Sequence, residues 1–377
     1  MGDAYNPIDG NHAKTPKEIE DLVKGTQELI LKRGELVNLM TDLTDYVALR
    51  ELWGRHQHQF NGGLDWRFDC ILDHNHSARF VKMYQNDTAS HKDATQKGVV
   101  GPRFCDASYV YDVREKDLQS NNAITIFNFV KTKMAQMYQS WYDLLEPALW
   151  GSPQYADDDV TPYGLAFWIQ KMSNSDYASH PEGGFYGMDP VLPKNATTET
   201  PTTVNRAGIS SSTYARWRNY CNQYSAISKD DLIKKMRRAF RSVDFKSPVK
   251  QITEPSLGGK GCGIYVNLDT IGTMEELLES QNMNLGNDLA SKDGKCVFKG
   301  HEVCYAPLLN DDATDPVYMI NWKTLALGVL AGWKEHLSEP MVVENQHNSR
   351  QVFLDGGLNM VCTNLRTQAV IHKAISG

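Results

Sequence analysis

A glycine-rich stretch is the first part of this 377-residue sequence that could do chemistry. Gly258-Gly259-Lys260-Gly261-Cys262-Gly263 is similar to loops whose backbone amides hold phosphate groups. A dinucleotide loop lies between a strand and a helix, whereas here a strand-like run, Ile264 to Leu268, follows the glycines. A P-loop needs Ser or Thr directly after its lysine, and Lys260 is followed by Gly261. The stretch therefore predicts a mobile glycine loop and not a nucleotide site.

Paired histidines flank a predicted strand and could act as metal ligands. His56 with His58, and His74 with His76 beside Asp73, lie two residues apart, so each pair shares one face of a strand. Zinc sites use such pairs, but they normally add cysteine or carboxylate ligands at fixed spacing. No cysteine with ligand spacing lies near these histidines. We expect solvated strand ends and no bound metal.

Local signatures of catalysis are missing from the sequence. It contains no Gly-x-Ser-x-Gly elbow, no HExxH helix and no kinase-type set of motifs. The acidic groups Asp311-Asp312 and Asp157–Asp159 stand in turn-rich sequence, which favours caps or surface charge. A glycosidase pair of carboxylates stays open, because its two members can come from anywhere in a chain. The prediction is no enzyme activity and no cofactor.

A basic run lies on a predicted helix that starts after the capping residue Ser228 and continues to about Ser242. The apolar residues fall on one stripe and the basic residues on the outer face. The stripe is Leu232, Ile233, Met236, Phe240 and Val243, and the basic residues are Lys234, Lys235, Arg237, Arg238 and Arg241. Such a face is usually solvated, and less often contacts phosphate or another subunit.

Composition indicates a globular protein of two or three domains. Hydrophobic residues make up 41% and charged residues 23%, and the net charge of −7 argues against a dedicated nucleic-acid binder. The seven cysteines are spread out, odd in number and without a CxxC pair, which suits free thiols in a reducing cytosol. The polar first 14 residues predict no signal peptide, and no apolar run is long enough to span a membrane.

The element that organises the chain is a long helix predicted over 121–145. Its apolar stripe has alternating spacings of four and three, and consists of Ala123, Phe127, Val130, Met134, Met137, Trp141 and Leu144. Ser120 and Asn121 supply capping side chains. Pro147 disfavours helical backbone at Glu146, so the predicted helix ends near Leu145. A core helix of an ordinary enzyme would show the same pattern.

Before this helix, the sequence predicts a weakly cored arm and then a long ribbon. Residues 1–53 hold a flexible start and two short helical patterns with little capacity for a core. From Gly54 the apolar period becomes two, as Leu64, Trp66, Phe68 and Cys70 alternate with charged residues. A polar tip follows, and strand-like sequence returns near Phe104. We interpret 54–114 as a two-stranded excursion that is stable only when it lies on a partner.

After the helix, the sequence is first irregular and then rich in short strands. Residues 173–212 contain many Pro, Gly, Thr and Asn residues, and such a segment usually has a contact role. Core packing and a subunit contact are equally open for Trp217, which Arg216 and Arg218 flank. Predicted later features are a strand from Gly263 to Leu268, a helix starting at Thr273, tight turns at Lys292–Lys295 and Asp355–Gly357, and strands near 296–298, 302–305, 317–320, 323–337 and 350–371.

Several stretches, taken in order, resemble tailed-bacteriophage major capsid proteins. Each motif is degenerate, and their order and spacing carry the resemblance, which covers most of the chain from about Gly54. It departs from the commonest pattern in the N-terminal arm and in the acidic insert at 151–163. The stretches are Phe185 to Pro193, Val204 to Ile209, Tyr214 to Asn219, Phe298 to Val303, Val317 to Leu325 and Leu358 to Val370.

The resemblance implies an α+β chain with a Hong Kong 97-like capsid fold. Such a fold has an N-terminal arm, an extended β-hairpin loop, a peripheral domain with a long spine helix, and an axial domain. The corresponding ranges are 1–53 for the arm, 54–114 for the loop, 115–227 for the peripheral domain with its spine helix at 121–145, 228–345 for the axial domain, and 346–377 for the return to the peripheral domain. Our independent order of arm, ribbon, rod-like helix and mixed domain agrees with it.

The implied function is a major capsid protein that self-assembles into the icosahedral head around the double-stranded DNA of a tailed bacteriophage. Implied partners are copies of the chain in hexamers and pentamers, portal, scaffold and decoration proteins, and DNA in non-specific contact. The location would be the virion, after assembly in the host cytoplasm and without membrane contact. The alternatives are an encapsulin-type nanocompartment shell and a cytosolic hydrolase.

Candidate assembly contacts come from the ribbon and from the tryptophan motif. Some relatives cross-link subunits through a loop lysine and a distant asparagine, but no acceptor motif can be assigned here, so we expect no cross-linking. The candidates are Trp66, Phe68, Lys82, Lys92, Lys97, Arg216, Trp217 and Arg218.

Overall fold

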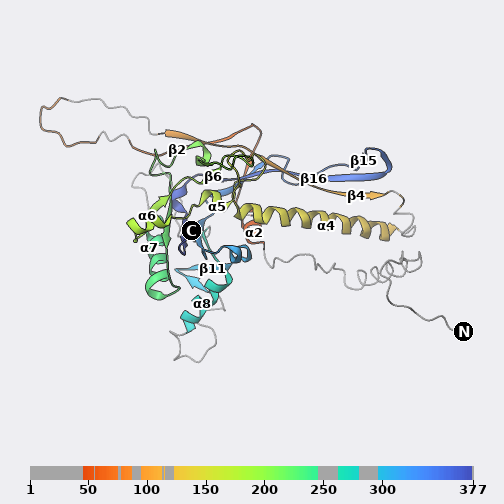
Figure 1. The fold of residues 1–377 in the computed structure, drawn as a ribbon. Helices are drawn as coiled ribbons and strands as arrows, with labels where there is room; N and C mark the ends of the chain where they lie inside the picture. Colours follow the sequence, from red (N-terminus) through yellow and green to blue (C-terminus); the bar gives the residue numbers. More distant parts are fainter. Residues whose placement is uncertain are drawn as a thin grey trace. The chain divides into compact units, whose positions relative to one another are not determined.

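The structure is a computed structural model of the chain (Figure 1). It describes residues 46–54, 56–74, 78–86, 95–112, 114, 123–244, 262–279 and 296–375. Most of the predicted arm, Lys92, most of the glycine loop and the predicted turn at Lys292–Lys295 lie outside these ranges. The chain divides into two compact units, one containing 106–141 and 337–354 and the other containing 43–105, 142–336 and 355–377.

The helices are short apart from one. The α-helices are α2 (Val47–Gly54), α4 (Ala123–Trp150), α5 (Leu165–Trp168), α6 (Asn174–Ser179), α7 (Lys234–Val243) and α8 (Leu268–Glu279). Single turns of other helix types are η1 (Arg206–Gly208), η2 (Lys229–Ile233), η4 (Pro307–Asp311) and η5 (Leu365–Thr367). Figure 1 shows α4 as one continuous helix, in keeping with the predicted rod.

A mixed sheet of seven strands forms the core of the larger unit within the described residues. Pairing is parallel between β11 and β9 and between β17 and β8, and antiparallel between β12 and both its neighbours. Every residue of β8, β12 and β17 is buried, as expected for strands covered on both faces. The order is β10 (Val297–Phe298), β11 (His301–Tyr305), β9 (Cys262–Val266), β12 (Val317–Asn321), β17 (Ala369–His372), β8 (Asn219–Gln223) and β5 (Gly184–Gly187).

Helix α7 covers one face of this sheet, as its sequence pattern predicts. Met236, Ala239 and Val243 are buried in a cluster with sheet residues such as Val266 and Met319. The predicted cap is confirmed, since the Ser228 hydroxyl accepts a hydrogen bond from the Asp231 amide at 3.2 Å. The basic residues of the helix are exposed, apart from Lys235, which is half-buried.

The second sheet runs along one very long strand, β16 (Gln346–Cys362). Strand β13 pairs with it antiparallel, and β1 pairs with β13 in parallel. The predicted turn at Asp355–Gly357 is wrong, because these residues continue the strand. Gly357 instead allows a close approach, since a Cβ there would lie 3.3 Å from Phe104 and Leu330. The other members are β1 (Gln57–Phe60), β13 (Leu325–Leu330), β14 (His336–Leu337), β15 (Met341–Val343) and β4 (Arg103–Asp112).

The predicted ribbon at 54–114 is only partly a self-paired hairpin. Strands β2 (Trp66–Ile71) and β3 (Thr95–Val100) pair with each other antiparallel over six residues each. By contrast, β1 pairs with β13 and β4 pairs with β16. Period-two sequence therefore predicted the strands but not all of their partners. A further small hairpin, β6 (Val191–Pro193) with β7 (Pro201–Thr203), lies in the segment that the sequence left irregular.

The long helix passes its predicted end near Leu145 and continues through Pro147 to Trp150. Buried contacts outweigh the preference of Glu146 for extended backbone. The Glu146 carboxylate accepts hydrogen bonds from the Ala48 and Leu49 amides, both at 2.9 Å, and from the Trp150 indole at 2.8 Å. The prediction for the last turns of the stripe is also wrong, because Leu145 is buried and Leu144 is 56% exposed.

Helix α8 begins five residues before the predicted capping box at Thr273. Asn267 supplies the cap instead, since its Oδ1 accepts a hydrogen bond from the Thr270 amide at 3.0 Å. The predicted strand to Leu268 is two residues too long, because β9 ends at Val266 and Asn267 directly follows it as the cap of α8.

His372, at the end of β17, is a buried neutral histidine. Its Nε2 accepts a hydrogen bond from the Met172 amide at 3.0 Å, and its Nδ1–H donates to the Lys373 carbonyl at 2.6 Å. Burial lowers the pKa of His372 to about 4; the bond to Lys373 opposes this shift, and the charge of Lys171 adds to it. A protonated ring would bury a charge and lose the Nε2 acceptor.

We expect His372 to make folding less favourable as the pH falls from 6.5 through about 4. In this range the imidazole is protonated in the unfolded chain but still neutral in the folded chain. The free energy of unfolding should lose about 2 kcal/mol from this group between about pH 7 and about pH 5. His372→Gln, which cannot titrate, should lack this part of the pH dependence in urea unfolding at the two pH values. The same pH dependence in both proteins would contradict the assignment.

Candidate assembly interface

The ribbon of β2 and β3 has one face toward the body of its unit and one face toward solvent. Trp66 and Cys70 are buried and Phe68 is half-buried, whereas Arg67 and Asp69 between them are exposed. The ring of Phe68 lies on Gly98 of β3, where a Cβ atom would come within 2.3 Å of it. A side chain at this position would push the Phe68 ring aside, so the glycine allows the ring to lie flat on β3.

Aromatic contacts fix the base of the ribbon. Trp66 is 1% exposed, and its ring stacks on Phe60 with centroids 4.4 Å apart. The same ring lies over Gly328 of β13, where a Cβ would come within 2.5 Å of it. On the same face of the ribbon as Trp66, the centroids of the Phe68 and Trp217 rings lie 6.4 Å apart. The ribbon therefore leaves the body in a set direction.

Cys70 completes the buried face of the ribbon. Its thiol donates to the Thr363 carbonyl at 3.6 Å. Burial raises the pKa of Cys70 to about 11, and the neighbouring charge of Asp69 adds to the shift. The thiol is therefore protonated near neutral pH and acts as part of the apolar packing.

Trp217 belongs to a buried polar framework centred on Arg206. The Arg206 guanidinium is fully buried and donates to the carbonyls of Trp168 and Gly187, both at 2.7 Å. It also donates to Asn219 at 3.1 Å, to the Trp217 carbonyl at 3.3 Å and to the Asp189 carboxylate at 3.2 Å. In return, the Trp217 indole donates to the Arg206 carbonyl at 3.1 Å. Guanidinium has five donors in a fixed plane, which suits it to join several segments.

The charge of Arg206 is held by its partners. Burial lowers the pKa of the guanidinium, and the Asp189 carboxylate opposes this shift, so the cation persists. Asp189 also accepts a hydrogen bond from the Ser211 amide at 2.7 Å, and the Ser211 hydroxyl accepts one from the Asp189 amide at 2.8 Å. Next to Arg206, Ala207 has a left-handed backbone with φ of 54°, an uncommon state for a residue with a Cβ.

Beyond the base, apolar residues of the ribbon face solvent. Leu64, two residues before β2, is 90% exposed, and Ile71 at the end of β2 is exposed as well. The described segment 78–86 has no strand or helix, and its large apolar residues are largely uncovered: Phe80, Val81, Met83 and Tyr84. We call these four residues the apolar tip. An exposed apolar group of this density is typical of a contact surface.

A small turn shapes the apolar tip. The Gln85 amide donates to the Lys82 carbonyl at 3.2 Å, and the Lys82 amide donates to the Gln85 side chain at 3.1 Å. Tyr84 within this turn has φ of 63°, which L-residues adopt only at a cost. The turn therefore holds Tyr84 in a strained conformation while its ring stays in solvent.

The predicted contact residues with described positions fall into three groups, which are buried, half-buried and exposed. Trp66 and Trp217 are buried within the chain, so in a single subunit they act as core and position other groups. Phe68 and Arg218 are half-buried, and Arg218 donates to the Ser211 carbonyl at 2.9 Å. The candidates with exposed side chains are Lys82, Lys97 and Arg216, and Lys92 lies outside the described residues.

Among the described residues, those that the sequence singled out for chemistry are not gathered into a reaction centre. Within the described residues, no three His, Cys, Asp or Glu side chains lie close enough to hold a metal ion. Burial opposes ionisation of Asp158 and Asp312, but hydrogen bonds to Asp158, chiefly from Thr161, and the contact of Asp312 with Lys171 lower both pKa values. His56 stacks on Trp322 with ring centroids 6.4 Å apart, which is a packing role.

The six cysteines with described side chains are all unbonded thiols. Burial raises the pKa of both Cys221 and Cys362 to about 12, so these two are inert in neutral solution. As for membranes, none of the described helices combines the length and the apolar character that a membrane span needs.

Comparison with known proteins gives relatives in structure but not in sequence. No family model matches the chain, and no curated protein matches it in sequence. The subunit of the cyanophage A-1(L) capsid matches with a TM-score of 0.60 at 13% identity, over 90% of this chain and 96% of that one. The bacteriophage PhiM1 mature capsid matches with a TM-score of 0.50 at 10% sequence identity, over 92% of this chain and 91% of that one. The SrpI encapsulin of Synechococcus elongatus PCC 7942 matches with a TM-score of 0.50 at 8% sequence identity, over 92% of this chain and 95% of that one.

These matches extend over nine-tenths of both chains in each pair, so they concern the whole architecture and not one shared motif. The chain has the fold of phage capsid proteins, and the predicted α+β, Hong Kong 97-like fold is confirmed. The domain bounds inferred from the resemblance stay predictions.

Sequence reasoning missed the Arg206 framework and the exposure of the apolar tip. Arg206 stands inside a stretch quoted for the resemblance, but nothing in its neighbours signals that it is buried. For the tip, the interpretation of 54–114 as one two-stranded excursion did not indicate where the first strand ends, and in the structure it ends at Ile71. A strand pattern that loses its alternation after Leu72 was the available signal.

Replacing Arg206 should destabilise the fold strongly. Arg206→Met would leave the Asp189 carboxylate buried without its cation, at a cost of about 3–5 kcal/mol in the free energy of unfolding. Arg216→Met, at an exposed position in the same segment, should change this free energy by less than about 0.5 kcal/mol. Urea unfolding of both variants tests this, and equal values for the two would show that the framework is not stabilising.

Proposed function

We propose that the chain is a major capsid protein that self-assembles into the icosahedral head of a tailed bacteriophage around double-stranded DNA. The observation that carries this proposal is the capsid fold, matched over 90% of the chain and 96% of the cyanophage subunit. The apolar tip supports the proposal independently. Its four side chains are exposed in a single chain, and contact with a neighbouring copy would remove them from water, which is favourable.

In this proposal the chain acts by assembly and not by catalysis. Hexamers and pentamers of the chain form the wall, with portal, scaffold and decoration proteins as partners. DNA is confined by the wall in non-specific contact, which agrees with a chain whose net charge is −7. The shell forms in the host cytoplasm and remains in the virion.

An encapsulin-type compartment shell is the second candidate, because the SrpI encapsulin has the same fold at a TM-score of 0.50. The higher score of the cyanophage capsid, 0.60, favours the phage head. The hydrolase hypothesis draws no support from these folds. The contents of purified particles separate the first two: encapsidated double-stranded DNA fits a phage head, and encapsidated protein without DNA fits a compartment.

Loss of the apolar tip should prevent assembly without unfolding the subunit. We expect Phe80→Ser combined with Tyr84→Ser to lower the yield of closed shells about tenfold or more, since each buried aromatic contributes about 1.5–3 kcal/mol to a contact. The circular dichroism spectrum should stay unchanged, because both rings are exposed in the subunit. Mass photometry of the purified chain measures the yield.

Val191→Ser is the matched control, since Val191 is also an exposed apolar residue but lies in the β6 hairpin. It should assemble like the unchanged chain. Shells formed by the double variant in normal yield would exclude the apolar tip as an assembly contact. If the unchanged chain itself formed only small discrete particles, the shell function would be excluded as well.

A further inference from the structure

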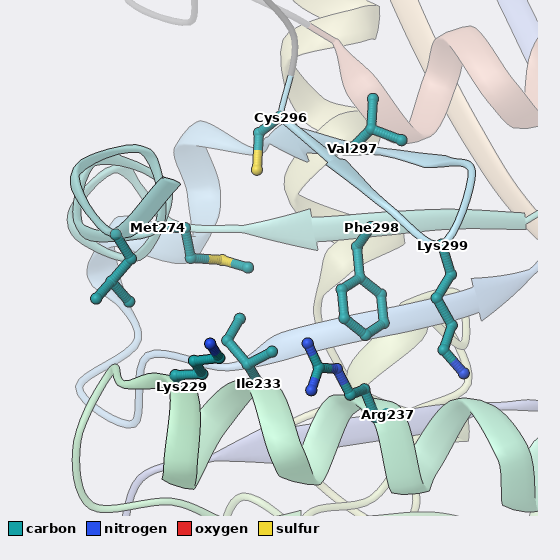
Figure 2. Close-up of a pocket in the computed structure, with 9 residues that line it drawn as sticks. Lys229, Ile233, Arg237, Met274, Cys296, Val297, Phe298 and Lys299 are labelled. Carbon is teal, nitrogen blue, oxygen red and sulfur yellow. The ribbon is translucent and has the colours of Figure 1, made fainter. Parts of the chain in front are cut away.

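A cavity of about 260 Å³ lies between helix α7, helix α8 and the β10–β11 hairpin, all in the larger unit. Figure 2 shows side chains from these elements converging on it. None of the residues used above for packing the ribbon or for the Arg206 framework lines it. The cavity is therefore a separate feature of the fold.

The interior of the cavity is apolar. Ile233 comes from the beginning of the α7 segment, Met274 from α8, and Cys296 and Phe298 from the hairpin side. Burial raises the pKa of the Cys296 thiol, and the charge of Glu275 adds to the shift, so the thiol stays neutral. Such an interior favours a hydrocarbon group over water.

Cations surround this interior. Lys229 and Arg237 approach from the α7 side, and Lys299 from the turn of the hairpin. Lys299 and Gly300 form the two-residue turn and both have positive φ, 48° and 85°, so the turn geometry fixes where Lys299 starts. Its ammonium lies 4.7 Å from the centroid of the Phe240 ring.

Among the described residues, the cations that line the cavity form no salt bridge, unlike Lys235 and Arg238 of α7. Lys235 pairs with Asp231 at 2.6 Å, and Arg238 pairs with Glu182. In the described part of the chain, no carboxylate lies within salt-bridge distance of the three cations that line the cavity. Burial lowers the pKa of Lys299, and repulsion from Arg241 and Arg237 lowers it further, whereas the charge of Asp244 opposes the shift. The net shift downward indicates that positive charge outweighs negative charge around Lys299.

We propose that this cavity binds a small amphipathic anion, with an apolar chain among Ile233, Met274 and Phe298 and a carboxylate or phosphate head beside Arg237 and Lys299. The apolar interior selects the chain, and the cations select the sign of the head. The volume suits a short chain and not a whole bilayer lipid. Binding here does not depend on the shell function proposed above.

Three probes of equal chain length test the proposal by isothermal titration calorimetry on the full-length protein: octanoate, octanamide and octyltrimethylammonium. Octanoate should bind once per chain, with a Kd about tenfold or more below that of octanamide, since charge-assisted hydrogen bonds are about twice as strong as neutral ones. Octyltrimethylammonium should bind most weakly. Equal affinity for the anion and the amide, or no binding of octanoate, would overturn the proposal.

Variants place the bound probe in the cavity. Arg237→Gln and Lys299→Gln should each weaken octanoate binding and leave octanamide binding unchanged. Lys234→Gln is the control, because Lys234 is an exposed cation of the same helix that does not line the cavity. Met274→Trp should fill the cavity and abolish binding of both probes. If Lys234→Gln weakened octanoate as much as Lys299→Gln does, the selection would be a general charge effect and the proposal would be wrong.

A measurement on the unchanged chain guards against variants that misfold. Cys296 lines the cavity, whereas Cys304 does not, so at about pH 9, where part of the Cys296 thiol ionises, octanoate should slow the alkylation of Cys296 by iodoacetamide and leave Cys304 unaffected. Mass spectrometry of the alkylated peptides reports the two rates separately. An unchanged rate at Cys296 under saturating octanoate would place the probe elsewhere and overturn the assignment.

Discussion

Uncovered apolar surface at the end of the ribbon is the constraint on which this account of the protein depends. Phe80, Val81, Met83 and Tyr84 are held out in water, while the base of the same ribbon is packed tightly on the body. Burial of one such side chain is worth about 1.5–3 kcal/mol, so contact with another subunit is favourable wherever geometry allows it. Association of copies of the chain would remove this apolar surface from water.

The rest of the larger unit gives that tendency a direction. Trp66 and Phe68 fix the base of the ribbon, and the Arg206 framework holds the Trp217 that Phe68 contacts. At the end of α4, Glu146 ties the first turn of α2 to the helix, and Trp150 packs on Tyr265 and Tyr318 of the central sheet. Packed supports of this type allow the ribbon to contact a neighbouring copy in one defined geometry.

Local sequence patterns predicted the features that depend on local physics. The alternation from Trp66 to Cys70, the cap at Ser228 and the long apolar stripe each follow from neighbouring residues, and the capsid fold followed from the order of several motifs. Features that depend on long-range contacts could not be predicted from the sequence. Glu146 keeps α4 helical through Pro147 by bonding residues almost a hundred positions away, and Gly357 serves an approach to Phe104 and not a turn. The cation-lined cavity is formed by three segments that are separated in the sequence, so no single stretch predicts it.

The most direct test is an electron cryomicroscopy reconstruction of particles assembled from the purified chain, at a resolution that shows side chains around residues 78–86. The account predicts closed shells in which Phe80 and Tyr84 are buried against a neighbouring subunit. A chain that remains monomeric at high concentration, or shells in which Phe80 and Tyr84 fold back on their own subunit, would contradict it.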